Sequence, residues 1–140
     1  MIDIENAVYS RVYTAIKATY PNIDMDSTYT ASPASFPHVS LFESDNYVLE
    51  KTQDENVEND VRVMYTLEVF SNKQNSKKSE AKAIFAIADN TLLSLNFTRT
   101  SKTPVPNEDR TIYRIVARYE AIIHKGIKDG DDTIYQIYRH

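Results

Sequence analysis

Residues 61–71 read VRVMYTLEVFS, and this stretch decides the fold because two kinds of side chain alternate along it. The odd positions are all aliphatic or aromatic: Val61, Val63, Tyr65, Leu67 and Val69. Successive side chains of a β-strand point to opposite faces of its sheet, so this alternation is typical of a strand with one buried face. The sequence therefore predicts a half-buried strand over residues 61–71.

The segment after this strand, SNKQNSKKSEAK (residues 71–82), is polar and carries lysines just before a helical pattern. Strand, loop and helix in this order are also the layout of a phosphate-binding loop. Such a loop needs glycines, because they let consecutive backbone N–H groups converge on the anion. The segment contains no glycine, so we interpret it as a solvated corner between a strand and a helix.

Two segments, residues 3–20 and 77–95, have the apolar spacing of amphipathic helices. The apolar stripe of the first includes Ile4, Val8, Val12 and Ile16, and that of the second includes Ala81, Ile84, Ala88, Leu92 and Leu95. Asp3 is well placed to cap the first helix, and Pro21 ends it.

Further strands are predicted over residues 37–44, 96–100, 110–124 and 133–139. The segment SKTPVPNED (residues 101–109) is predicted to be a loop, because proline cannot donate a hydrogen bond to a strand ladder. Residues 43–60 are mostly acidic and polar, interrupted by the short apolar YVL (residues 47–49). This acidic loop is predicted to begin as a brief strand or turn and to continue as a mobile segment.

These elements together predict the fold class. A sheet with one apolar face needs a second layer, and two amphipathic helices can supply it. The prediction is a single α+β domain over residues 1–140, with two layers: a mostly antiparallel sheet and two amphipathic helices packed on one face of it.

The composition restricts the function. The chain has 140 residues, no cysteine and a net charge of −4, so disulfides and thiolate chemistry are excluded. No apolar run approaches the roughly 20 residues that span a bilayer, and no membrane partner is expected. The acidic total argues against general binding of nucleic acids, which depends on neutralising phosphates.

The charge is distributed unevenly along the chain. Residues 1–60 hold 11 acidic and 3 basic residues, whereas residues 61–140 hold 9 acidic and 13 basic residues. One interpretation is an ordinary solvated surface. The other is that one end of each copy docks on the opposite end of a neighbour.

No group of residues has the spacing of a catalytic or metal site. His38, His124 and His140 lie far apart, with no further ligand to complete a metal site. No G-x-S-x-G motif is present. Four acidic residues lie in the predicted loop, where tuning of their pKa by burial is not expected; these are Asp54, Glu55, Glu58 and Asp60. The sequence therefore predicts no enzyme activity, no cofactor and no metal.

The strand predicted over residues 110–124 carries arginines on its second face. Arg110, Arg114 and Arg118 occupy even positions together with Glu120, beside Ile112, Val116 and Ile122. Simple exposure to solvent explains a mixture of arginine with isoleucine and valine poorly. We therefore expect this face to meet a partner subunit or to line a channel. Nucleic-acid binding remains a weaker interpretation, because that face lacks aromatic residues for base stacking.

With these elements in order, the chain resembles the tail terminator (tail completion) proteins of long-tailed, siphovirus-type bacteriophages. The resemblance begins with the N-terminal helix and the strand YTLEVFSN, and continues with the helix SEAKAIFAIADNTLLSL. The strand NFTRT, the loop PVPNEDRT and the strand YRIVARYEA complete it. It covers most of the chain, best over residues 65–121, and the acidic segment 43–60 has no counterpart in the family pattern.

The resemblance implies a structural role in the virion without catalysis or cofactor. Such proteins form a hexameric ring of identical subunits that caps the tail tube, ends its polymerisation and offers a surface to the connector or head-completion protein. The sheets line the lumen, DNA only passes through it, and the loops contact the tube and the head; Asp54, Glu55, Glu58 and Asp60 would lie in such a loop. The protein would be assembled in the host cytoplasm and reside at the head-proximal end of the tail.

Two other classes remain open at this stage. One is another ring-forming component of the same virion, such as a head-closure protein or a tail-tube protein. A tube protein polymerises on its own and relies more on strands and long hairpins. The other class, a small enzyme or nucleic-acid-binding domain, is disfavoured by the glycine-poor, acidic sequence.

Overall fold

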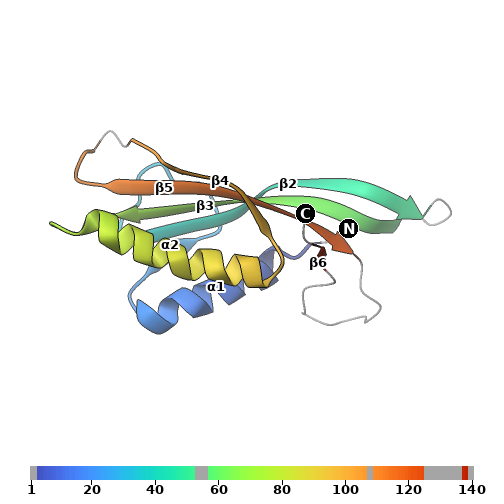
Figure 1. Ribbon diagram of the computed structural model, residues 1–140, viewed down its shortest axis with the longest axis horizontal. Helices are drawn as coiled ribbons and strands as arrows, with labels where there is room; N and C mark the ends of the chain where they lie inside the picture. The colour runs from blue at the N-terminus through green and yellow to red at the C-terminus, as the bar shows by residue number, and fades with distance from the viewer. Residues whose placement is uncertain (1–2, 53–56, 107–108, 125–136, 139–140) are drawn as a thin grey trace.

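The strand predicted first, β3 (Val57–Ser71), lies in the middle of the sheet of the computed structural model (Figure 1). The structure describes residues 3–52, 57–106, 109–124 and 137–138. The other elements are α1 (Glu5–Thr19), β1 (Asp24–Asp26), β2 (His38–Thr52), α2 (Lys77–Ser94), β4 (Thr98–Pro104), β5 (Tyr113–His124) and β6 (Ile137–Tyr138).

The strands form one sheet in the order β1-β2-β3-β5-β4. All neighbours in this order are antiparallel except β1 and β2, which are parallel. β6 pairs antiparallel with the end of β5, at Ile122 and Ile123. Residues 133–136 and 139 of the predicted last strand lie outside the described part of the chain.

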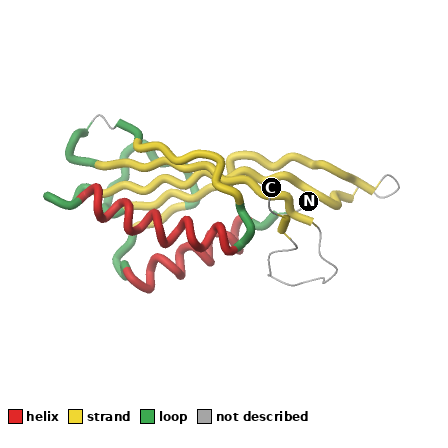
Figure 2. The backbone as a smooth tube through the Cα atoms, in the orientation of Figure 1, coloured by secondary structure: helices red, strands yellow, loops and turns green. Residues whose placement is uncertain are grey.

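Both helices cover the same face of the sheet (Figure 2). α2 packs over β3 and β5, and α1 packs beside α2 against β2. The odd positions of β3 and β5 point into this core and meet the apolar stripes of the helices; all of Val61, Val63, Tyr65, Leu67, Val69, Ile115, Ala117 and Tyr119 are buried there. The predicted α+β fold with two layers is therefore confirmed.

Asparagines shape both ends of α2 in a chain that has only two glycines. Asn75 precedes the helix with φ 69°, and Asn96 follows it with φ 68°. Asparagine tolerates this left-handed region better than other residues with a Cβ atom. The N-cap position of α1 is Ile4 and not the predicted Asp3. The carboxylate of Asp3, one residue earlier, accepts a hydrogen bond from the N–H of Glu5 (3.1 Å).

A buried polar contact fixes α2 to the sheet. The hydroxyl of Tyr119 donates to Oδ1 of Asp89 (2.6 Å), and Nη1 of Arg99 donates to Oδ2 of the same carboxylate (2.8 Å). Asp89 lies in α2, Tyr119 in β5 and Arg99 in β4, so three elements meet at one carboxylate. Burial, followed by the neighbouring Asp89, raises the pKa of Tyr119 above its ordinary value.

Replacing Asp89 is expected to destabilise the fold. Asp89→Ala leaves the fully buried hydroxyl of Tyr119 without an acceptor, which costs about 1–3 kcal/mol of unfolding free energy. The double variant Asp89→Ala/Tyr119→Phe removes the stranded donor and is expected to recover part of that loss. Urea denaturation measures both, with Asn90→Ala on the exposed side of α2 as the control. A loss no greater than that of the control would contradict the role of this contact.

The prediction of an acidic loop is wrong for residues 43–52 and 57–60, and residues 53–56 lie outside the described part of the chain. Residues 43–52 continue β2, residues 57–60 begin β3, and the two strands form a long antiparallel hairpin. The pairing of β2 with β3 shifts register three times, between Glu43 and Asp45, between Val48 and Glu50, and between Glu50 and Lys51. Each bulge adds one residue to one of the two strands, so the side chains beyond it point to the opposite face. The strands stay paired, but their sequence no longer alternates between apolar and polar residues.

The sequence also misjudged the edges of the sheet. β4 runs on to Pro104, where a loop was predicted from residue 101. Because β4 is an edge strand, a proline at its end removes a donor that the ladder does not need. β1 was missed because three residues are too few to show a periodic pattern. β5 begins at Tyr113, three residues later than the predicted strand.

Candidate functional site: the helix-free face of the sheet

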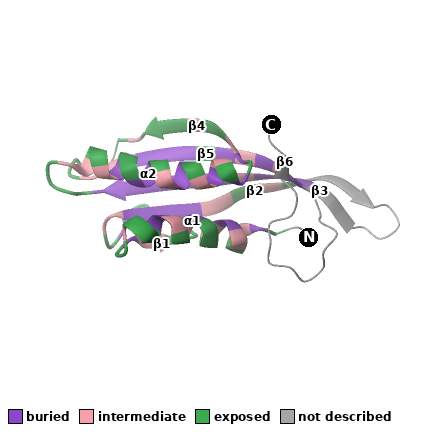
Figure 3. Cartoon of the chain, turned by 60° about the horizontal axis from the view of Figure 1, so that its bottom comes forward, coloured by how far each residue is buried: buried purple, intermediate pink, exposed green. Residues whose placement is uncertain are grey.

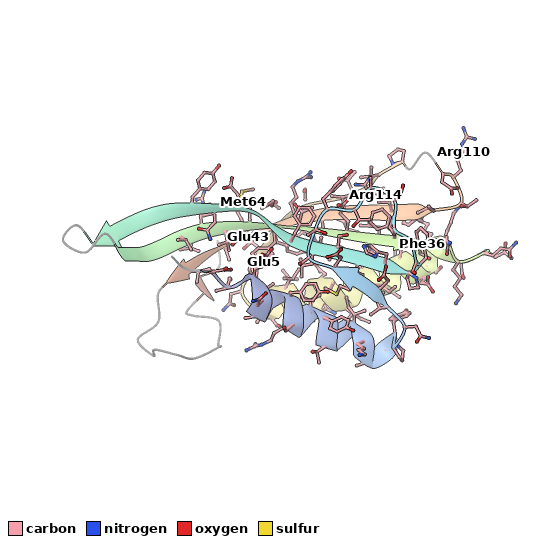
Figure 4. The ribbon with its side chains drawn as sticks, turned by 180° about the vertical axis from the view of Figure 1, so that it is seen from behind. Glu5, Phe36, Glu43, Met64, Arg110 and Arg114 are labelled. Carbon is pink, nitrogen blue, oxygen red and sulfur yellow. The ribbon has the colours of Figure 1, made fainter. Side chains whose placement is uncertain are left out.

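The sheet face opposite the helices is the candidate functional site, and we call it the helix-free face. The even positions of β3 and β5 point to it, since the odd positions enter the core. It carries Arg62, Met64, Thr66 and Glu68 from β3, and Arg114, Val116, Arg118 and Glu120 from β5. Figure 4 shows this side, with Met64 and Arg114 labelled.

The segment between the parallel strands β1 and β2 crosses part of this face (Figure 4). It must return the chain to the same end of the sheet, and the helices already cover the other face. His38, the first residue of β2, joins the two strands: its Nδ1 lies 2.8 Å from Oδ2 of Asp24, and its Nε2 lies 3.1 Å from Oγ of Ser40. These contacts give His38 a structural role.

The rest of the helix-free face forms an open groove of about 660 Å³. Its apolar lining includes Tyr29, Phe42, Met64, Val105 and Val116, and its charged lining includes Asp45, Glu68, Arg114 and Arg118. Tyr29 comes from the crossing segment, so the segment forms one wall of the groove.

Two aromatic side chains on this face are unusually exposed. Tyr29 is 61% exposed and Tyr47 is 53% exposed, and they are the exposed large hydrophobic residues of the described chain. Tyr47 pairs with Arg62 across β2 and β3, and the register places it on the same face as the arginines. Exposed aromatic residues on a face that also carries arginines are typical of protein interfaces.

Arg114 forms a buried ion pair with Glu68. Its Nε lies 2.9 Å from Oε1 of Glu68, and its Nη2 bonds the same oxygen. The side chain of Glu68 is only 2% exposed and that of Arg114 is 18% exposed. The guanidinium also lies 5.3 Å from the ring centre of Phe70. Glu68 keeps its second oxygen, Oε2, buried without a partner.

The other residues of the predicted arginine row differ from Arg114. Arg118 is exposed, and its side chain has no recorded partner within the described residues. Glu120 is half-buried and lies opposite Met64 and Thr98. Arg110 lies in the turn before β5 and is exposed there (Figure 4). The structure thus brings Arg114 and Arg118 together in the groove, while Arg110 stands at the end of the sheet.

The structure describes only part of the segment that holds the predicted acidic residues. Glu58 and Asp60 lie on β3, and Asp54 and Glu55 lie outside the described residues. Conversely, the sequence did not indicate Tyr29 or Tyr47 as functional residues. Tyr47 follows the first bulge of β2, so its face could not be deduced from alternation, and no sequence pattern signals the crossing segment that carries Tyr29.

A group of acidic residues lies on the other face, at the start of α1. The backbone N–H of Glu43 donates to Oε2 of Glu5 (2.8 Å). Partial burial raises the pKa of Glu43 to about 7; a hydrogen bond from Asn46 lowers it somewhat, and the charges of Asp3, Glu5 and Asp45 raise it further. The nearby Tyr65 is buried with its hydroxyl unpartnered, and burial raises its pKa.

Glu43 is expected to make stability depend on pH. In the unfolded chain its carboxyl ionises near pH 4.5, and in the folded chain near 7. Between these values the folded state holds a proton that the unfolded state has released, so the stability present below pH 4.5 is lost as the pH rises through 7. Glu43→Gln should therefore match the parent at about pH 4 and exceed it at about pH 8. Urea denaturation of both proteins at a series of pH values tests this. If the unfolding free energies of variant and parent changed with pH in the same way, the prediction would be contradicted.

The comparisons with known proteins name no family. No protein-family model matches the chain, and no curated protein matches it. No helix among the described residues is long and apolar enough to cross a membrane. Within the same residues, no three histidine or carboxylate side chains gather as metal ligands.

Proposed function

We propose that the chain is a structural subunit of a bacteriophage tail terminator, and that identical copies form a hexameric ring that caps the tail tube. In this proposal the ring ends tail polymerisation and presents its other surface to the connector or head-completion protein, while DNA only passes through the lumen. The protein then acts at the head-proximal end of the tail, without catalysis or cofactor.

The proposal is supported chiefly by the composition of the helix-free face. One face of the sheet is sealed by two helices, whereas the other exposes Tyr29 and Tyr47 beside a groove lined by Phe42, Met64 and Val116. Tyrosine, phenylalanine, methionine and arginine are enriched at the centres of protein interfaces. A face of this composition is expected to meet a neighbouring copy or to turn toward the lumen of a ring.

A tail-tube protein is the second candidate, and the β2–β3 hairpin favours it. Tube proteins rely on long hairpins, and this chain has two paired strands of 15 residues each. Residues 43–52 and 57–60 of these strands fall in the segment that the sequence predicted as a loop. The two candidates differ in what the purified protein should build, because a tube protein continues to polymerise whereas a terminator stops at one ring.

Sedimentation velocity and negative-stain imaging of the purified protein test the proposal. Closed rings that form as the concentration rises are the expected result. Open tubes would instead identify a tube protein. A chain that sediments only as a monomer at every concentration, with or without tube protein, would contradict ring formation altogether.

A further inference from the structure

The start of α1 lies beside a group of acidic side chains that we call the acidic cluster: Asp3, Glu5 and Glu43. The carboxylate of Glu5 accepts a hydrogen bond from the backbone N–H of Glu43 (2.8 Å), and that of Asp3 accepts one from the N–H of Glu5 (3.1 Å). Glu5 and Glu43 lie close together where α1 begins (Figure 4). Two segments that are far apart in the sequence therefore bring their carboxylates to one place.

The acidic cluster lacks a cation. None of its three carboxylates forms an ion pair with a lysine or arginine among the residues that the structure describes. Partial burial is the main reason that the pKa of Glu43 rises to about 7, and the charges of Asp3, Glu5 and Asp45 add to the rise. The negative charge of the cluster is therefore not compensated within the described part of one copy.

A buried hydroxyl beside the cluster also lacks a partner. Tyr65 is 0% exposed, and its hydroxyl forms no hydrogen bond with the described residues. Tyr65 lies directly opposite Glu43 in the ladder of β2 and β3, so both side chains point to the helical side of the sheet. Burial raises the pKa of Tyr65, and the nearby charges of Glu43, Glu5 and Asp3 raise it further. Because buried polar groups are usually hydrogen-bonded, this hydroxyl is a second and independent indication of a ligand.

The arrangement of the acceptors favours a guanidinium group over a metal ion. Among the described residues, no three histidine or carboxylate side chains gather closely enough to hold a metal ion. A guanidinium instead offers five N–H donors in a rigid planar fork, which can reach acceptors that do not converge on one point. Its contacts with carboxylates are short, charge-assisted hydrogen bonds. The ligand that fits the cluster is therefore an arginine side chain.

The helix-free face carries an arginine that a second copy can present to the cluster. Arg62, Arg114 and Arg118 lie on this face. Arg62 and Arg114 are half-buried, whereas Arg118 is exposed and forms no ion pair with any described residue. The cluster lies on the helical side of the sheet, so it cannot be reached by Arg118 of the same copy. The two groups belong to different surfaces of the chain.

We propose that Arg118 of one copy binds the acidic cluster of the next copy, an inference that rests on the proposed ring. The guanidinium compensates the charges of Asp3, Glu5 and Glu43, and it brings N–H donors to the side of the cluster where the hydroxyl of Tyr65 lies. A contact between different surfaces of identical subunits is head-to-tail, and its repetition forms a ring when the rotation closes. The helix-free face of each copy thereby meets the helical side of its neighbour.

Two variants with reversed charge test this pairing at about pH 8, where Glu43 is ionised. The cluster variant carries Asp3→Lys and Glu43→Lys, which change the formal charge of the cluster from −3 to +1. The arginine variant carries Arg118→Glu. In sedimentation velocity, each variant alone is expected to associate about tenfold or more weakly than the parent, because like charges then meet at every contact.

The equimolar mixture gives the decisive result. The reversed cluster of one variant faces the reversed charge at position 118 of the other, and the remaining contact is the native one, so mixing should restore rings with alternating subunits. Combining all three substitutions in one chain should restore association as well. Neither rescue is expected if Arg118 only lines the lumen or if the cluster only supports the start of α1.

A neutral variant separates binding from folding. Asp3→Asn/Glu43→Gln removes two charges of the cluster but keeps hydrogen-bonding side chains at both positions. It should unfold at the same temperature as the parent or higher at about pH 8, and it should still associate more weakly. Arg11→Glu, which reverses an exposed arginine of α1 outside the contact, is the control and should leave association unchanged.

The contrary outcomes distinguish this inference from the proposed function. Rings from either reversed variant alone, at the concentration that the parent requires, would overturn the pairing but leave the ring proposal standing. A neutral variant that associates as tightly as the parent would do the same. Folded variants that fail to associate both alone and mixed would also overturn the pairing. A parent chain that never forms rings would overturn both proposals.

Discussion

Replacing Arg114 is expected to cause the largest loss of stability of any single change on the helix-free face. Arg114→Ala leaves the carboxylate of Glu68, which is 2% exposed, without its cation. Removing one partner of a buried ion pair typically costs about 3–5 kcal/mol, because the other charge stays desolvated. Chemical denaturation of the variant should show a loss of this size in the unfolding free energy.

Two further variants show whether the loss of stability comes from the unpaired charge of Glu68 or from lost packing of Arg114 against Phe70. Arg114→Ala/Glu68→Gln removes the charge and should recover part of the stability that Arg114→Ala loses. Arg118→Ala, on the same strand but exposed, should change the unfolding free energy by no more than about 0.5 kcal/mol. If Arg114→Ala lowered the unfolding free energy no more than Arg118→Ala does, the ion pair would not stabilise the fold.

Arg118→Glu is expected to abolish ring formation while the monomer stays folded. Arg118 is exposed and borders the groove, so its reversal removes no core contact. If the helix-free face meets a neighbouring copy or lines a charged lumen, the reversal places like charges where complementary ones stood. In a phage, the expected result is tails of uncontrolled length that do not join heads.

Thermal unfolding and negative-stain imaging of the same preparation provide the two readings that this test requires. The unfolding temperature should equal that of the parent, and rings should be absent. Reversing Arg114 together with Arg118 would confuse the readings, because Arg114 stabilises the monomer. A stable Arg118→Glu variant that still forms rings and terminates tails would show that this part of the face is solvated surface.

The alternating run of β3 was sufficient to predict the central strand and the two faces of the sheet. Its odd residues, such as Leu67 and Val69, are fully buried. The same reasoning placed Arg114 and Arg118 on the face opposite the helices. Where the backbone keeps a regular period, the sequence shows which side of an element is covered.

The partners of those side chains could not be predicted in the same way. Glu68 and Arg114 are 46 residues apart, and they meet only because β3 pairs with β5 in one particular register. That register depends on the core contacts of the whole sheet, which no local pattern shows. The pairing of β2 with β3 beyond residue 43 was not predicted for a different reason, since three register shifts conceal the alternation of its side chains.

The edge strand β4 also affects how readily copies of the chain aggregate at high concentration. β4 is largely exposed (Figure 3), and an open strand edge is a template for uncontrolled pairing with other chains. Here Pro104 ends the strand and Pro106 follows two residues later, so two amide donors are missing where an added strand would continue the ladder. The two prolines therefore disfavour the addition of a further strand from another chain at this edge.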